Sequence, residues 1–181
     1  MQKFLTLFGV LVFSLLTACS TVSTQDIKVE TESDSKVNLA AYHSYVWIGA
    51  SSVLNDPEEK WQPTEVDLAG DIKYLIDREL RKNNIFGVKD DADLGVAYFL
   101  GVDMDAMQLK VNPETETIVL ENVPKGALVV ALVDMQTGYV VWLGSARADI
   151  AKTFQADIAR ERLDYAISKM FKNLTSKGIF K

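Results

Sequence analysis

Three kinds of side chain in this sequence have the chemistry for covalent or acid–base work: one thiol, one imidazole and several neighbouring carboxylates. The thiol belongs to Cys19 and the imidazole to His43. A thiol can be oxidised to a disulfide or modified covalently, and an imidazole can transfer protons or bind a metal. Because each occurs once, the chain can form neither an intramolecular disulfide nor a zinc site built from cysteines and histidines.

His43 lies in residues 41–48, whose aromatic and β-branched side chains predict a strand. A Ser-His-Asp relay would have to use this histidine, yet the G-x-S-x-G turn that presents a nucleophilic serine is absent from the sequence. The phosphate-binding motifs G-x-x-x-x-G-K and G-x-G-x-x-G are absent as well. We therefore expect no enzymatic activity and no cofactor.

Carboxylates occur in short clusters of a kind that can attract a cation. None follows the calcium-loop spacing, in which acidic residues alternate ahead of a glycine and a glutamate follows further on. Acidic side chains are almost never buried without a partner, so we interpret the clusters as solvated loops and strand ends and predict no metal site. The clusters are Glu58 with Glu59, Asp90 and Asp91 with Asp93, Asp103 with Asp105, and Glu114 with Glu116.

Cys19 has more distinctive surroundings than His43. It ends an apolar N-terminal run and directly follows Leu16, Thr17 and Ala18. This tetrad resembles the bacterial lipobox, the signal at which a leader is cut just before a cysteine whose thiol and new amino group are then acylated. The resemblance implies a lipoprotein signal peptide at residues 1–18, recognised through Leu16, Thr17 and Ala18, and an acylated Cys19.

The leader has the other features of a secretory signal. Lys3 supplies positive charge, and residues 4–16 form an apolar core. This stretch is interrupted by Thr6 and Ser14 and is shorter than the roughly 18 residues that a membrane-spanning helix needs. We therefore predict a cleaved leader rather than a transmembrane helix, and a mature protein held on the membrane through the acyl chains on Cys19.

Ser20, directly after the cysteine, bears on the destination of such a lipoprotein. In lipoproteins of diderm bacteria an aspartate at this position tends to retain the protein at the inner membrane. The resemblance therefore implies the outer membrane, with the body facing the periplasm. Residues 19–26 comprise the acylated cysteine and a short polar tether. We expect the membrane as one partner and envelope proteins as others.

The remaining chain, residues 27–181, is long enough for a single domain with a sizeable core. Hydrophobic residues make up 48% of the sequence and charged residues 24%, which is ordinary for a globular protein. The formal net charge is −6, and an acidic body is repelled by nucleic acid and by anionic lipid headgroups. The composition therefore excludes a nucleic-acid partner and leaves the lipid as the means of attachment.

Segments with the period of a strand and segments with the period of a helix follow one another along this domain. Apolar residues recur at helical spacing in residues 64–84, where Thr64 is the expected N-cap, and in residues 155–175. Strand patterns occupy residues 27–31, 41–48 and 93–104 and two hairpins, 109–120 and 127–148. This order predicts an α+β fold: an antiparallel or mixed sheet of about six strands with two long helices packed mainly on one face.

Residues 93–104 form the clearest strand pattern. Large apolar side chains alternate with Gly95, Ala97, Phe99 and Gly101, so one face is large and the other mostly small. We expect this strand at the centre of the sheet and covered on both sides. A helix or a neighbouring backbone is expected to lie close over the glycines.

Four aromatic residues on predicted strands are candidates for a shared site: Tyr45, Trp47, Tyr98 and Trp142. On one side of the sheet they would line an apolar pocket for a lipid, a glycan or a hydrophobic metabolite. The alternative is an ordinary core, because aromatic side chains dominate core burial.

Three short blocks follow one another in a recognisable order. They are Tyr42-x-x-Tyr45-x-Trp47, Ala92-Asp93-Leu94-x-Val96-x-Tyr98 and the segment from Gly138 to Ala146. With the lipobox and a closing amphipathic helix, they resemble the lipoprotein family catalogued as domain of unknown function 4136, over nearly all of the mature chain. Two positions depart from the family pattern. Leu143 stands where a basic residue is common, and residues 173–175 stand where the family has a Phe-Pro-Pro-like ending.

The family carries no established activity, so the resemblance implies a fold and a location but no mechanism. The sequence favours a non-catalytic, lipid-anchored envelope protein that presents an interaction surface in the periplasm. The alternative is a periplasmic carrier or sensor that binds a small apolar ligand between the sheet and the helices.

Overall fold

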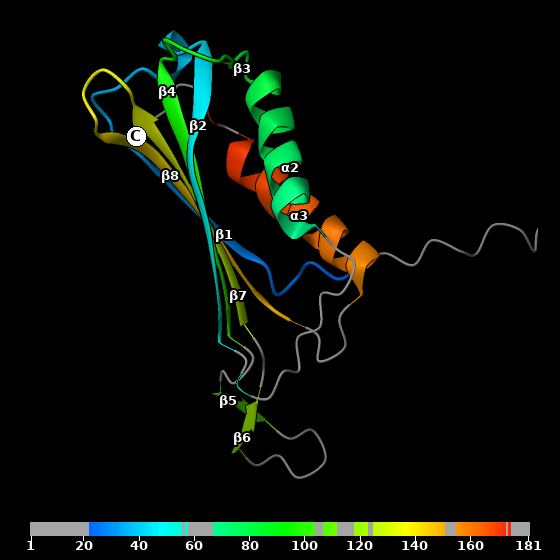
Figure 1. The fold of residues 1–181 in the computed structure, drawn as a ribbon. Coiled ribbons are helices and arrows are strands. Elements are labelled where there is room, and N and C mark those ends of the chain that lie inside the picture. The colour runs from blue at the N-terminus through cyan, green and yellow to red at the C-terminus, as the bar shows by residue number, and fades with distance from the viewer. Residues whose placement is uncertain are drawn as a thin grey trace, which may run out of the picture.

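A mixed sheet of six strands is the frame of the domain (Figure 1). The computed structural model describes residues 22–55, 57, 67–103, 107–111, 118–122, 125–150, 155–172 and 174. In chain order the strands of the main sheet are β1 (Lys28–Ser33), β2 (Ser44–Asn55), β3 (Phe86–Gly87), β4 (Leu94–Asp103), β7 (Lys125–Asp134) and β8 (Val140–Asp149).

These strands lie side by side in the order β1-β8-β7-β4-β2-β3. Strand β2 is parallel to β4 and β3, and every other neighbouring pair is antiparallel. A separate two-stranded sheet pairs β5 (Met107–Val111) with β6 (Ile118–Asn122). Strand β4 therefore occupies the interior of the main sheet, as its pattern predicts.

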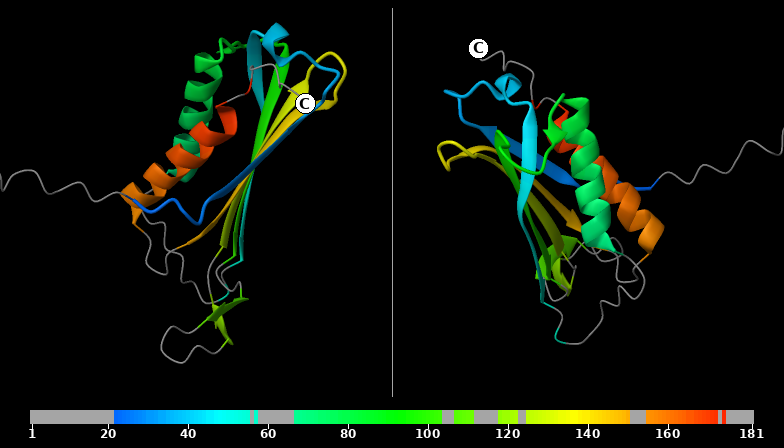
Figure 2. Two further views of the ribbon diagram at one scale, coloured as in Figure 1. Left: turned by 180° about the vertical axis from the view of Figure 1, so that it is seen from behind. Right: turned by 45° about the horizontal axis from the view of Figure 1, so that its top comes forward.

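Two helices, α2 (Leu68–Lys82) and α3 (Ala156–Phe171), cover one face of the main sheet (Figures 1 and 2). A short 3-10 turn, η1 (Leu39–Ala41), precedes β2. This arrangement confirms the predicted α+β fold with a mixed sheet and both helices on one face. No helix in the described ranges is both long and apolar enough to span a membrane.

Helix α2 begins later than its apolar pattern predicts. Asp67 caps it, because the Asp67 carboxylate accepts a hydrogen bond of 2.8 Å from the backbone N–H of Gly70. The expectation that Thr64 is the N-cap was wrong, and Thr64 itself lies outside the described residues.

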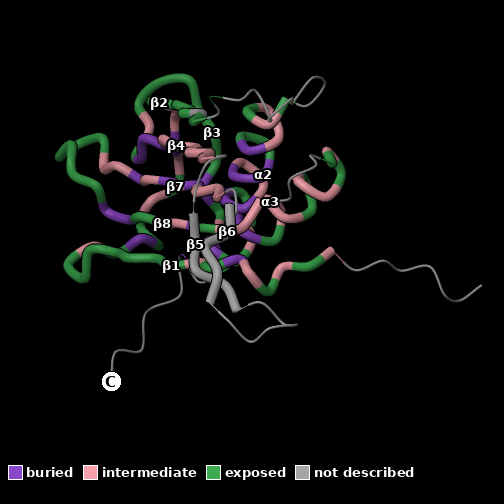
Figure 3. The backbone as a smooth tube through the Cα atoms, turned by 90° about the horizontal axis from the view of Figure 1, so that it is seen from below, coloured by how far each residue is buried: buried purple, intermediate pink, exposed green. Residues whose placement is uncertain are grey.

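The core lies between the sheet and the helices (Figure 3). From β4, the alternate side chains of Leu94, Val96 and Tyr98 are buried there. They meet the buried stripe of α2 and the buried C-terminal half of α3, as the periodicities predict. The buried residues of the two helices are Ile72, Leu75, Ile76, Glu79, Leu80, Ala166, Ile167, Met170 and Phe171.

The expectation that β4 is covered on both sides was wrong. Phe99, on the face away from the helices, is 43% exposed. Gly95 on this face does have close neighbours, but they are side chains of β2 and of the turn after β7. A Cβ added to Gly95 would lie 2.7 Å from Ile48 Cδ1 and 2.9 Å from Met135 Sδ. The side chains of Ile48 and Met135 therefore lie over Gly95, where the sequence pattern predicts a helix or a neighbouring backbone.

Gly144 on β8 faces the core and allows a close approach by Trp142. A Cβ at position 144 would overlap the Trp142 ring, which is only 4% exposed and has little room to move. We expect Gly144→Ala to lower the free energy of unfolding by about 1–3 kcal/mol, the usual cost of overpacking. Urea denaturation of the purified protein measures this change.

Gly49→Ala is the matched control, since Gly49 is an exposed strand glycine whose added Cβ would lie 3.8 Å from Ala97 Cβ, an ordinary contact. This variant should leave stability unchanged or raise it slightly, because alanine loses less backbone entropy on folding. Equal effects of the two substitutions would refute the steric account.

The two helices are joined by a charged cluster built around Glu79 of α2. The Glu79 carboxylate accepts hydrogen bonds from Arg78 (2.6 Å), Lys82 (2.9 Å) and Ser168 of α3 (3.1 Å). Arg78 also donates to Asp164 of α3. Glu79, the buried member of this cluster, thus has both cationic and hydroxyl partners, as a buried carboxylate requires.

This cluster makes stability depend on pH in the acid range. Burial alone would raise the pKa of Glu79, but the bonds from Lys82, Arg78 and Ser168 outweigh it and lower that pKa. The hydrogen bond from Arg78 is the main cause that lowers the pKa of Asp164. The stability contributed by these carboxylates is present above their unfolded-state pKa of about 4 and is lost as the pH falls through the lower folded-state values.

We therefore expect the free energy of unfolding to fall as the pH is lowered from about 6 to about 3, and to fall less steeply in Arg78→Met. Urea denaturation at several pH values measures both slopes. Lys73→Met, which removes a cation of α2 that does not bond to Glu79, is the control and should keep the wild-type slope. Parallel curves for wild type and Arg78→Met would count against the cluster as a source of pH dependence.

Candidate functional site

The predicted lipidation site falls outside the described residues, and so do the signal-recognition residues Leu16, Thr17 and Ala18. The same holds for Cys19 and Ser20. Residues 22–26, by contrast, are described, and they lie against the body. Arg162 of α3 donates hydrogen bonds to the Asp26 carboxylate and to the backbone oxygen of Ser23. Asp26 also accepts a hydrogen bond from the backbone N–H of Asp149, at 2.9 Å.

The structure brings three of the four candidate aromatics together. Trp47 packs edge to face against Tyr45, with ring centroids 6.4 Å apart, and against Tyr98, with centroids 6.1 Å apart. Asp77 of α2 accepts hydrogen bonds from the Tyr45 hydroxyl (2.5 Å) and from Trp47 Nε1 (3.1 Å). Rings in mutual contact beneath a helix form a packed layer between sheet and helix.

The fourth candidate, Trp142, belongs to a different part of the core. Its ring packs against Phe171 of α3, with centroids 4.8 Å apart. The four residues therefore do not surround one common space.

The polar groups near these aromatics form hydrogen bonds within the domain. Burial and the hydrogen bond to Asp77 raise the pKa of Tyr45, so its hydroxyl stays protonated at neutral pH. His43 is exposed, and its backbone N–H donates to the Asp93 carboxylate at 2.8 Å. Asp93 thereby joins the start of β2 to the start of β4. Within the described ranges no group of three or more His, Cys, Asp or Glu side chains is placed to hold a metal.

Among the described residues no helix covers the face of the main sheet opposite α2 and α3, here called the open face. Its central side chains are apolar although they point away from the core. Ile48 is 48% exposed, Phe99 43% and Leu143 38%. Val129 and Ala131 of β7 lie between Phe99 and Leu143 in the sheet register and are half-buried. Exposed apolar side chains that are contiguous in this way are typical of an interaction site.

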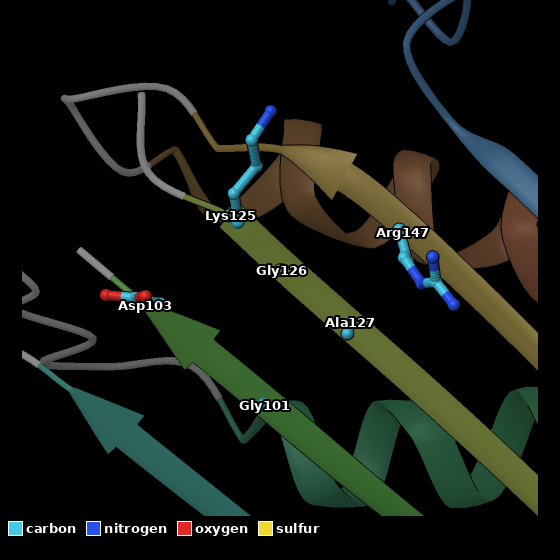
Figure 4. Close-up of a pocket in the computed structure, with 6 residues that line it drawn as sticks. All are labelled: Gly101, Asp103, Lys125, Gly126, Ala127 and Arg147. Carbon is cyan, nitrogen blue, oxygen red and sulfur yellow. The ribbon is translucent and has the colours of Figure 1, made fainter. Parts of the chain in front are cut away.

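Charged side chains border the open face along β1. Lys28, Glu30 and Glu32 alternate on this strand and are exposed. The register places Lys28 directly opposite Arg147 of β8, and Glu32 directly opposite Leu143. A shallow hollow of about 290 Å³ adjoins this border near the ends of β4, β7 and β8 (Figure 4). It is lined by Gly101, Asp103, Lys125, Gly126, Ala127 and Arg147.

Sequence reasoning missed the open face as a site. A signal for it was present, since both alternating sets of residues in 127–133 are apolar, whereas a strand with one solvated face has one polar set. The small outward residues of residues 93–104 instead favour covering by a helix or by a neighbouring backbone. The charged border could not be found in this way, because it depends on the pairing of β1 with β8.

The structure thus defines a two-layer α+β protein in which the two helices cover one face of the main sheet and no described helix covers the other. The family model described as "Domain of unknown function (DUF4136)" matches residues 29–174, and the chain belongs to that family. This membership confirms the resemblance that the three sequence blocks indicate. A search of curated proteins found no match.

Several solved structures are similar to this chain at low sequence identity. A PDZ domain protein from Parabacteroides distasonis is 13% identical with a TM-score of 0.53, over 84% of this chain and 36% of that chain. A PelC dodecamer from Paraburkholderia phytofirmans is 15% identical with a TM-score of 0.47, over 83% and 99% of the two chains. A minor lipoprotein from Acinetobacter baumannii is 12% identical with a TM-score of 0.34, over 75% and 94%. Of these three, only the PDZ domain protein exceeds a TM-score of 0.5, and at 13% identity that likeness describes the fold alone.

Proposed function

We propose that this protein is a non-catalytic lipoprotein, anchored by acyl chains on Cys19 to the periplasmic side of the outer membrane, which presents the open face of its sheet to a protein partner. The observation that carries this proposal is the open face itself. Its apolar centre is formed by Ile48, Phe99 and Leu143, and its border is charged. An apolar core with a polar rim is the usual anatomy of a protein interface.

The contacts of residues 23–26 support a short distance between body and membrane. Because Arg162 binds Ser23 and Asp26, at most four residues, 19–22, separate the acylated cysteine from the bound part of the chain. At about 3.5 Å per residue this length holds Ser23 within roughly 14 Å of the acylated cysteine. The open face is thus presented close to the membrane surface.

The aromatic residues give less support to the alternative of an apolar-ligand carrier. Tyr45, Trp47 and Tyr98 contact one another, and Trp142 lies against α3. A bound ligand would have to separate rings that already fill the layer between sheet and helix. Interaction through the open face is therefore the function that the geometry supports best.

In-cell photo-crosslinking of the full chain tests the interaction surface. One variant carries a photo-crosslinking residue in place of Leu143 on the open face, and the matched control carries it in place of Tyr74 of α2, which is 62% exposed. We expect a crosslinked protein adduct from position 143 and none from position 74. Adducts from both positions, or from neither, would overturn the proposed surface.

The Ser20→Asp variant, produced in the same bacterial cells as the crosslinking variants, tests the sorting of the lipoprotein between the two membranes. Because an aspartate after the lipidated cysteine favours retention at the inner membrane, this variant should move from the outer- to the inner-membrane fraction on a density gradient. Ser20→Ala is the control and should stay with the outer membrane. A wild-type protein found in the inner-membrane fraction would contradict the proposed location.

A further inference from the structure

The open face carries a charge arrangement that is unfavourable in a single copy of the chain. Lys28 and Arg147 are exposed, point to the same side and are directly opposite each other in the β1–β8 register. Like charges placed opposite each other across a strand pair destabilise the sheet. Within the described ranges neither cation forms an ion pair. Glu32, which follows Glu30 on the open side of β1, forms none either.

A two-fold axis relieves this arrangement. On the open side of β1 the residues run Lys28, Glu30, Glu32, and Glu30 lies in the same row across the sheet as Val129 and Phe99. Consider a second copy stacked on the open face by a two-fold rotation about an axis that runs along this row, between the two sheets. Residues on one side of the row in one copy then face residues on the other side of the row in the second copy. Lys28 of each copy then lies opposite Glu32 of the other, and a two-fold interface repeats this contact, so that two pairs of opposite charge form. Glu30, on the axis row, lies opposite Glu30 of the second copy, so that one pair of like charges remains at the edge of the interface.

The same axis places the apolar side chains at the centre. Phe99 and Val129 lie on the axis row, and Leu143 and Ala131 lie in the adjacent row. Gly101 and Ala127, which line the hollow, lie in the row on the other side of the axis. They then face Ala97 and Ala131 of the second copy. Small residues in both rows allow two sheets to approach to the roughly 10 Å of ordinary sheet packing.

The area is sufficient for a stable dimer. Strands β4, β7 and β8 have ten residues each, and with β1 and β2 they form the open face. At about 4.8 Å between strands and about 3.3 Å per residue, the face covers roughly 700 Å². A standard protein interface buries about 800 Å² on each partner.

We propose that the partner of the open face is a second copy of this chain, stacked sheet to sheet about a two-fold axis at the row of Glu30, Val129 and Phe99, with reciprocal Lys28–Glu32 ion pairs. This inference rests on the proposed interaction surface and names its occupant. It holds whether or not Cys19 is acylated, because no residue of the tether takes part.

Native mass spectrometry of the full-length protein, released from mild detergent, tests the dimer. We expect a dimer for wild type and a monomer for Phe99→Glu, whose dimer dissociation constant should rise about a hundredfold, the size of effect seen at central interface residues. Tyr74→Glu introduces the same charge at an exposed aromatic of α2 and should leave the dimer intact. A monomeric wild type, or a dimer that survives Phe99→Glu, would overturn the proposal.

Charge reversal tests the axis. Lys28→Glu and Glu32→Lys should each weaken the dimer about tenfold. In either variant residues 28 and 32 carry the same charge, and the two-fold axis places them opposite each other at two places in the interface. A mixture of the two variants should form a heterodimer of wild-type strength, since both facing pairs of residues 28 and 32 are then again of opposite sign. Lys28→Glu also removes the repulsion with Arg147 inside one copy, so misfolding does not account for its loss of dimer. Failure of the mixture to associate would refute this axis.

The crosslink from position 143 separates the two proposals. An adduct that contains only this chain supports the second copy. An adduct with a different protein retains the interaction surface and overturns the dimer.

Discussion

Cys19→Ala is expected to abolish acylation of the protein completely and to leave residues 1–18 attached. The reason is chemical: the thiol is the acceptor for the first lipid, and Cys19 is the only cysteine of the chain. In lipoproteins with this signal the leader is cut only before the lipidated cysteine. The variant should therefore incorporate no labelled fatty acid and keep its leader, whereas the wild type loses the leader and gains the mass of the acyl chains.

Labelling with a fatty acid and intact-mass spectrometry measure both changes. Ser20→Ala, one residue further on, is the control and should be processed and acylated like the wild type. An unmodified thiol at position 19 of the native protein, or a native protein that retains its leader, would exclude the anchor. The body carries a formal charge of −6 and is repelled by anionic headgroups, so the anchor is the expected source of its membrane affinity.

The sequence was sufficient to predict those elements that have a strong period. Apolar residues at helical spacing located α2 and α3, and the alternation in residues 93–104 located β4 and its interior position. Local patterns succeed here because each element must bury one stripe or one face. The start of α2 was misplaced because Thr64 and Asp67 are both good capping residues, and the choice between them depends on where the chain leaves the sheet.

The bare face of the sheet was harder to predict, because apolar and small residues pointing outward look the same as a second buried face. Ile48 and Met135 lie over Gly95, a contact between strands that are distant in sequence. The attachment of the tether was missed for the same reason, since Asp26 and Arg162 are separated by 136 residues. Long-range ion pairs leave no local pattern in the sequence.

The candidate aromatics illustrate the limit of reasoning from residue type. Tyr45, Trp47 and Tyr98 do share a face, as alternation requires, but a shared face becomes a pocket only if the opposite layer stands away from it. Here α2 lies close enough for Asp77 to bond to both Tyr45 and Trp47. That distance is set by the packing of the whole core.

Phe171→Ala is expected to cost about 3–5 kcal/mol in free energy of unfolding, the usual range for a buried phenylalanine. Phe171 is 0% exposed and lies at the end of α3, where it meets the ring of Trp142 across the layer between helix and sheet. Truncation removes the ring that packs on Trp142 of β8 and leaves a cavity between α3 and the sheet. Because a packed core relaxes only partly around a deleted side chain, little of the lost contact is recovered.

For a chain of this size a loss of that order lowers the melting temperature by about 10 °C, which calorimetry of the detergent-solubilised protein measures. Phe86→Ala removes the same side chain at a position that is 53% exposed and should change stability by less than about 0.5 kcal/mol. Near-ultraviolet circular dichroism should change in Phe171→Ala alone, because Trp142 loses its aromatic neighbour. If both variants melt with the wild type, α3 is not held on the sheet by this contact, and the covered face would have to be stabilised chiefly by the ion pairs of Arg78 and Arg162.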